Sequence, residues 1–164
     1  MMAQKIGKHV NELSGEPDKL YVVGGAVRDE IIGKKVNDYD LITTMEYKQF
    51  AKMFDAEDVR FRGKNIIVVP VIDGEPFETA CLTRTMSLED RLLASDLTMN
   101  GMAKDVSTGE IIDPCNGQRD IQNKVINLTD FMKDAMPQGK QPVAVLRCVR
   151  FTSIFGWEMT PDTK

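Results

Sequence analysis

Apolar residues in this 164-residue chain follow two patterns, short continuous runs and runs with helical spacing. Short runs of apolar and β-branched residues that are bounded by turn-forming residues predict strands. We expect strands at 20–23, 39–43, 65–72, 77–83, 97–103 and 110–113. Apolar residues three and four positions apart predict helices. We expect helices at 3–14, 26–32, 46–54 and 88–93, then two more after about residue 129, the second running from 141 or 142 to 155.

Helix ends and turns in this pattern have the expected chemistry. Gly33 is placed to end the first of the central helices, since glycine adopts the left-handed conformation found there. Ser87, with Asp90 three residues later, is suited to cap the start of another helix. The tetrapeptide Asp73-Gly74-Glu75-Pro76 predicts a tight turn between two strands.

The elements predict an α+β fold, with a small mixed β-sheet and flanking helices in residues 1–128 and the start of a short helical segment in residues 129–164. Hydrophobic residues make up 42% of the chain and charged residues 28%, which argues against disorder. No apolar run approaches the ~18 residues of a membrane span, and the N-terminus lacks the apolar region of a signal peptide. We therefore expect a cytoplasmic protein that does not contact a membrane.

Charge and the rarer residue types narrow the function further. Cys81, Cys115 and Cys148 are widely spaced, which favours neither a disulfide framework nor a zinc site. The single histidine, His9, has polar neighbours, so histidine-based triads and zinc hydrolysis are disfavoured. The net charge of −4 argues against a protein that coats nucleic acid, but not against an enzyme that binds RNA through a small basic cleft.

Gly24 and Gly25 separate a predicted strand from a predicted helix. Glycines at such a point let the backbone approach a phosphate, and the helix N-terminus supplies free N–H groups. Arg28, one turn into the helix, adds a guanidinium that suits phosphate oxygens. Without further residues, two adjacent glycines before a helix are more often only a tight turn.

Asp38 and Asp40 lie at the start of the next predicted strand. Alternation along a strand places both carboxylates on one face, where they repel each other unless a cation such as Mg²⁺ lies between them. A third acid on a neighbouring strand would complete a two-metal site, and Glu78 is the candidate. An isolated D-x-D motif is otherwise usually a solvated surface feature.

Five segments in order resemble the head domain of bacterial-type CCA-adding enzymes and poly(A) polymerases, which belong to the DNA polymerase beta nucleotidyltransferase superfamily. The first joins VVGGAVRDEIIG at 22–33 to NDYDLITT at 37–44. The others are SLEDRLLASDLTMNGMA at 87–103, IIDPCNGQRDI at 111–121, LRCVRF at 146–151 and FGWEM at 155–159. The resemblance covers nearly the whole chain, and it identifies residues 1–128 as the catalytic head and 129–164 as the start of the helical neck.

The resemblance implies a role for each matching residue. Gly24, Gly25 and Arg28 would hold the triphosphate of an NTP such as ATP or CTP, and Asp29 would fix that loop. Asp38 and Asp40 would ligate magnesium and, with Glu78, form the catalytic set. The remaining nucleotide-binding residues implied in this way are Arg84, Asp96, Asn100, Arg147 and Arg150. The acceptor would be an RNA 3′ end, that of tRNA in the first instance.

The chain also departs from the family pattern. Ala94 and Ser95 replace two arginines that precede the motif's aspartate, so two cations facing the triphosphate are missing. The neck motif E-D-x-x-R, which templates the bases C and A, reads KQPVA at 140–144. Glu78 lies one residue further from Arg84 than the family spacing, which leaves its role as third ligand open.

Three functions remain open. The first is an active magnesium-dependent nucleotidyltransferase with tRNA as acceptor, which the retained Asp38 and Asp40 favour. The second is the same chemistry with a different acceptor or base, which the altered residues at 94–95 and 141–144 favour. The third is an inactive RNA- or nucleotide-binding module that needs a partner chain or forms an oligomer, which the net acidity favours.

Overall fold

A mixed seven-stranded sheet forms the centre of the computed structural model, which describes residues 20–63, 65–83, 85–135 and 142–163. The order of its strands is β3-β4-β7-β2-β1-β8-β9, and the β2–β7 pair is parallel whereas the others are antiparallel. The strands are β1 (Leu20–Val23), β2 (Asp40–Thr43), β3 (Val59–Arg62), β4 (Asn65–Val68), β7 (Thr79–Cys81), β8 (Ala103–Asp105) and β9 (Ile111–Ile112). The predicted α+β class with a mixed sheet is confirmed.

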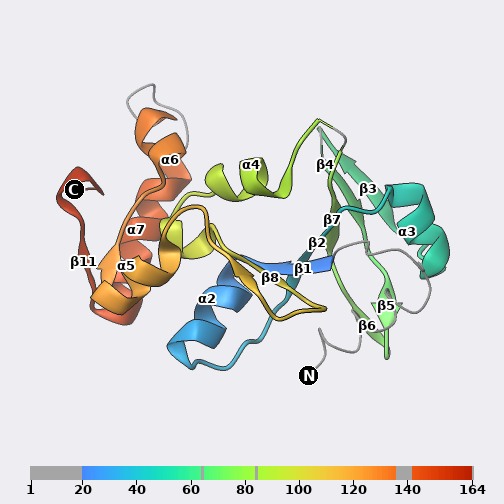
Figure 1. Cartoon of the computed structure of the whole chain (residues 1–164), viewed down its shortest axis with the longest axis horizontal. Helices are drawn as coiled ribbons and strands as arrows, with labels where there is room; N and C mark the ends of the chain where they lie inside the picture. The colour runs from blue at the N-terminus through green and yellow to red at the C-terminus, as the bar shows by residue number, and fades with distance from the viewer. Residues whose placement is uncertain (1–19, 64, 84, 136–141, 164) are drawn as a thin grey trace.

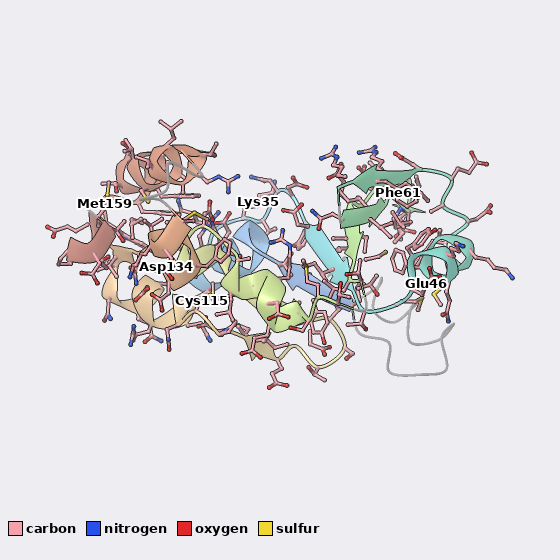
Figure 2. All side chains as sticks on the ribbon, turned by 90° about the horizontal axis from the view of Figure 1, so that it is seen from above. Lys35, Glu46, Phe61, Cys115, Asp134 and Met159 are labelled. Atoms are coloured by element: carbon pink, nitrogen blue, oxygen red, sulfur yellow. The ribbon has the colours of Figure 1, made fainter. Side chains whose placement is uncertain are left out.

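Helices lie along this sheet and at both of its ends (Figure 1). They are α2 (Gly25–Ile32), α3 (Tyr47–Met53), α4 (Leu88–Leu93), α5 (Gly117–Asn123), α6 (Asp130–Ala135) and α7 (Pro142–Phe155), with the short 3₁₀ helices η1 (Thr98–Asn100) and η3 (Pro161–Thr163). Helix α3 covers the β3–β4 end, whereas α5, α6 and α7 gather at the opposite end. Figure 2 shows the same separation, with Glu46 and Phe61 far from Asp134 and Met159.

Strand β1 places side chains in two cores, one on each face of the sheet. Leu20 and Val22 pack in the larger cluster, whereas Tyr21 packs against Leu92 and Ala103 on the other face. Successive strand side chains point to opposite faces, which explains this division. Because Leu92 belongs to α4, its burial fixes that helix against the face opposite the main core.

The helical C-terminal segment shares the main core. Ala144, Cys148 and Phe151 of α7 are buried in the same cluster as Val27 of α2. Strand β10 (Val125–Ile126) also pairs in parallel with β11 (Glu158–Met159), across the predicted boundary at 128. The division into a head and a neck stays a prediction, but the two segments pack as one body.

Several predicted elements differ from the structure. Residues 97–103, predicted as extended, contain η1, and the strand β8 only begins at Ala103. Val69 and Pro70 divide the predicted strand 65–72 into β4 and β5 (Val71–Ile72), because proline cannot donate to a sheet. The turn at Asp73-Gly74 is confirmed and joins β5 to β6 (Glu75–Pro76). The predicted helix 3–14 lies outside the described residues.

Candidate active site

A cleft of about 820 Å³ lies where the sheet, α4 and α7 meet. This volume is within the range of small-molecule sites, roughly 300–1,000 Å³. Its walls include eight residues predicted for the site: Gly24, Gly25, Arg28, Asp38, Asp40, Glu78, Asp96 and Asn100. Arg147 and Arg150 of α7 also line it. The structure therefore brings together the predicted residues it describes, and Arg84 lies outside the described residues.

The glycine turn at the base of the cleft requires a residue without a side chain. Gly24 has φ 68° and ψ −129°, which L-residues other than glycine rarely adopt. Its N–H donates to the Met102 carbonyl at 3.1 Å, and its own carbonyl accepts from the Arg28 N–H at 3.2 Å. The turn thus directs the N-terminus of α2 into the cleft, where free N–H groups favour an anion.

The two aspartates lie directly across from this turn. Asp40 begins β2 and pairs with Val23, the residue before Gly24, and Asp38 precedes the strand by two positions. Both side chains are exposed to solvent. Surrounding protein atoms still displace part of the water near Asp40, and this desolvation raises the pKa of its carboxyl. The neighbouring Asp38 and Glu78 carboxylates raise this pKa further. Uncompensated repulsion of this kind is what a divalent cation relieves, so the oxygen donors at Asp38 and Asp40 fit Mg²⁺.

Glu78 reaches the same place through the parallel pairing of β2 and β7. The Leu41 N–H donates to the Glu78 carbonyl at 3.2 Å, which places Glu78 beside Asp40. Its carboxylate also accepts a hydrogen bond from Arg60 at 2.7 Å. In the described part of the chain, no group of three or more His, Cys, Asp and Glu side chains is arranged to hold a metal. Glu78 as a third ligand therefore stays a prediction.

The predicted nucleotide-binding residues form a chain of hydrogen bonds across the cleft. Arg28 donates to Asp29 at 2.8 Å and to the Asn100 side chain at 2.7 Å. Asn100 in turn donates to Asp96 at 3.2 Å. Arg147 of α7 donates to the other oxygen of Asp96. Helix α7 is thereby connected to the glycine turn through a chain of polar groups, of which Arg28 and Asp96 are buried. The role of Asp29 in fixing the glycine loop stays a prediction.

Besides several apolar residues, the cleft contains Phe151 and Arg91, which were not predicted for it. Phe151 lies under the Arg28 guanidinium, whose central carbon is 4.7 Å from the ring centroid. Arg91 lines the cleft from α4, together with Ala94 and Ser95. The sequence held a signal for Arg91, since it is a cation in the helix that leads directly to the altered positions Ala94 and Ser95.

The family model described as the poly A polymerase head domain matches residues 20–84 and 71–127. The chain belongs to this family. Its glycine turn, aspartate pair and Asp96–Asn100 motif all lie within the matched residues. The resemblance inferred from the sequence is therefore confirmed.

Named relatives agree with this assignment. The chain is 32% identical over 151 residues to the CC-adding tRNA nucleotidyltransferase of Shouchella clausii, covering 92% of this chain and 39% of that protein. It is 30% identical over 175 residues to the CCA-adding enzyme of Geobacillus kaustophilus, covering 94% and 41%. The structure of the Bacillus stearothermophilus CCA-adding enzyme in complex with CTP has a TM-score of 0.79 at 29% identity, covering 98% and 41%. This chain thus spans about two fifths of these relatives' length.

Proposed function

We propose that this chain is the catalytic head of a magnesium-dependent nucleotidyltransferase that adds nucleoside monophosphates to an RNA 3′ end, with tRNA as the first candidate acceptor. The observation that carries the proposal is one cleft that holds the Gly24–Gly25 turn opposite the Asp38 and Asp40 carboxylates. A turn for phosphates and a carboxylate pair for a cation are the two parts that phosphoryl transfer requires.

The reaction follows from this arrangement. The 3′-hydroxyl oxygen of the RNA bonds to the α-phosphorus of the triphosphate, the bond to the β-phosphate oxygen breaks, and pyrophosphate leaves. The hydroxyl proton passes to water. Magnesium, when bound at Asp38 and Asp40, would supply positive charge for the attacking and leaving oxygens. The N-terminus of α2 would orient the phosphates, and Asp96, Asn100 and Arg147 would face the base.

Transfer is tested by incubating the protein with tRNA that lacks its terminal nucleotides and with each labelled triphosphate in turn. Products are separated on a denaturing gel, with magnesium or with EDTA. We expect the RNA to be extended in magnesium and unchanged in EDTA. If no triphosphate extends the RNA in magnesium, the proposal is wrong, and the inactive binding module becomes the better description.

We further propose that the site discriminates weakly between the four bases. Weak discrimination would suit an enzyme whose acceptor or added base differs from that of the CCA-adding enzymes. Ala94 and Ser95 replace two cations, and residues 140–144 lack the acid and arginine of the templating motif. Each charge-assisted contact contributes about 1.5–3 kcal/mol, so fewer contacts leave less energy for discrimination. Dissociation constants for the four triphosphates, measured by calorimetry, should agree within a few-fold. A strong joint preference for CTP and ATP would contradict this.

A further inference from the structure

Helix α4 carries Arg91 into the cleft, beside the positions where the family has two arginines. The Ser87 hydroxyl accepts from the Asp90 N–H at 3.0 Å and caps the helix, while buried Leu92 fixes it to the sheet. Arg91, Ala94 and Ser95 all line the cleft. Ala94 is the C-cap of α4, three residues after Arg91, and Ser95 follows it outside the helix. Because all three line one cleft, the long Arg91 side chain borders the space that the two small residues leave.

Arg91 differs in its partners from two other arginines of the cleft, Arg28 and Arg147. Arg28 is held by Asp29 and Asn100, and Arg147 by Asp96. Among the residues that the structure describes, none forms a hydrogen bond or an ion pair with the Arg91 guanidinium. That side chain is exposed, and it lines the same cleft as Asp38 and Asp40. Arg91 therefore presents an available cation beside the carboxylate pair.

We infer that Arg91 binds the polyphosphate of the incoming nucleotide, supplying from one turn earlier in the chain the positive charge that Ala94 and Ser95 lack. A guanidinium can donate two parallel hydrogen bonds to phosphate oxygens, and one arginine can thus replace several weaker contacts. The inference rests on the proposed function for the identity of the ligand. The inference adds that Arg91 contacts the β- and γ-phosphates, which leave as pyrophosphate, and not the α-phosphate that is transferred.

The test compares the affinities of AMP, ADP and ATP for wild type, Arg91→Ala and Arg91→Lys, by calorimetry in magnesium. Arg119→Ala is the matched control, because Arg119 is 66% exposed on α5 and does not line the cleft. We expect Arg91→Ala to weaken ATP binding by roughly 10- to 100-fold and AMP binding by less than about twofold. Lysine should restore part of the loss, and Arg119→Ala should match wild type.

A second variant separates phosphate binding from a structural role. Arg91→Ala with Ala94→Arg moves the guanidinium by three residues on the same side of the chain, and exposed Ala94 leaves room for it. Recovery of at least about tenfold in ATP affinity supports the inference. Equal losses for AMP and ATP, or an Arg91→Ala variant that binds ATP like Arg119→Ala, would overturn it.

The transfer assay distinguishes this inference from the proposed function. If wild type transfers nucleotides and Arg91→Ala changes neither transfer nor ATP affinity, the proposed function holds and the inference about Arg91 is wrong. Wild type that binds ATP through Arg91 but extends no RNA removes the proposed function and keeps the polyphosphate site. Wild type that binds no triphosphate overturns both.

Discussion

Asp38 and Asp40 should be indispensable for transfer and dispensable for folding. Replacing either by asparagine removes a charged ligand while keeping the size of the side chain. Because metal stabilisation of phosphoryl transfer is worth several kcal/mol, we expect a loss of more than about 100-fold in transfer rate. The rate of labelled nucleotide addition measures this, and circular dichroism checks the fold. Glu57→Gln, an exposed acid that does not line the cleft, is the control. Transfer within tenfold of wild type would remove the metal assignment.

The raised pKa of Asp40 predicts a pH-dependent cost to stability. Ionisation is harder in the folded chain than in the unfolded chain, so stability decreases as the pH rises above the ordinary value of 3.8 through the folded pKa. Asp40→Asn removes this decrease. In EDTA we expect the variant to have a higher Tm than wild type at neutral pH and an equal Tm below pH 3.8.

Magnesium should then reverse the order at neutral pH, because a cation that binds only the folded wild type raises its Tm. Thermal unfolding with and without magnesium provides both readings. The opposite outcome is a lower Tm for Asp40→Asn than for wild type in EDTA at neutral pH. It would show that Asp40 stabilises the fold through a contact and that repulsion from its neighbours is not the dominant effect.

Helices α2 and α7 are joined by Arg28, and their docking should depend on it. Arg28 is only 9% exposed, donates to Asp29 and Asn100, and lies over the Phe151 ring. Hydrogen bonds to charged groups contribute about 1.5–3 kcal/mol, so Arg28→Ala should lower the free energy of unfolding by that amount. Urea unfolding measures the change.

Lys34→Ala is the matched control for this substitution. Lys34 also lies over an aromatic ring of α7, 4.3 Å from the Phe155 centroid, but it is exposed to solvent. Exposed cation–π contacts contribute about 0.5–1 kcal/mol, so its loss should be smaller. Equal losses in the two variants would mean that the hydrogen bonds of Arg28 do not contribute to the free energy of unfolding.

Elements with strong local signals were predictable from the sequence. Helix α4 begins at the predicted Ser87 cap, α2 ends at Gly33 in the left-handed conformation, and α7 ends at Phe155. The glycine turn and the aspartate pair were found for the same reason, since each depends on residues adjacent in the chain. The chemistry of such features is local and needs no knowledge of distant contacts.

The elements that were missed depend on distant partners. Strand β3 alternates Arg60 and Arg62 with apolar residues, and it is a strand because it pairs with β4 at the edge of the sheet. Helix α5 is preceded by Asn116 at φ 59°, and the Asp113 side chain accepts from the Gly117 N–H at 2.7 Å. The residue that accepts the hydrogen bond from its first N–H lies outside the helix, so the sequence at 116–117 indicated only a turn.

Over the molecule as a whole, the described residues offer little positive surface to an RNA. From the sequence, the basic residues that we expect near the acceptor are Arg60, Arg62, Lys64, Arg84, Arg147 and Arg150, of which Lys64 and Arg84 lie outside the described residues. Arg60 is paired with Asp58 and Glu78, and Arg147 with Asp96, which leaves fewer charges for phosphates. With a net charge of −4, general attraction to RNA is absent. We expect binding to be weak and limited to the terminal nucleotides.

A salt titration measures this limit. The plot of log affinity against log salt should have a shallow slope, about −0.7 for each single-stranded phosphate contacted. Intact tRNA and a short oligonucleotide with the same 3′ sequence should bind equally, since only the end is contacted. If tRNA binds a hundredfold tighter than the oligonucleotide, the chain has a surface for the body of tRNA.

The position of β1 in the middle of the sheet affects how the chain is made. β1 pairs with β8 through Val23 and Ala103, which is synthesised 80 residues later. At about 5–20 residues per second, one edge of this apolar strand stays unpaired for roughly 4–16 seconds on the ribosome. Unpaired apolar edges are sites of association between chains. Aggregation during expression would therefore result from the delay between the synthesis of β1 and that of β8, and not from low stability of the folded protein.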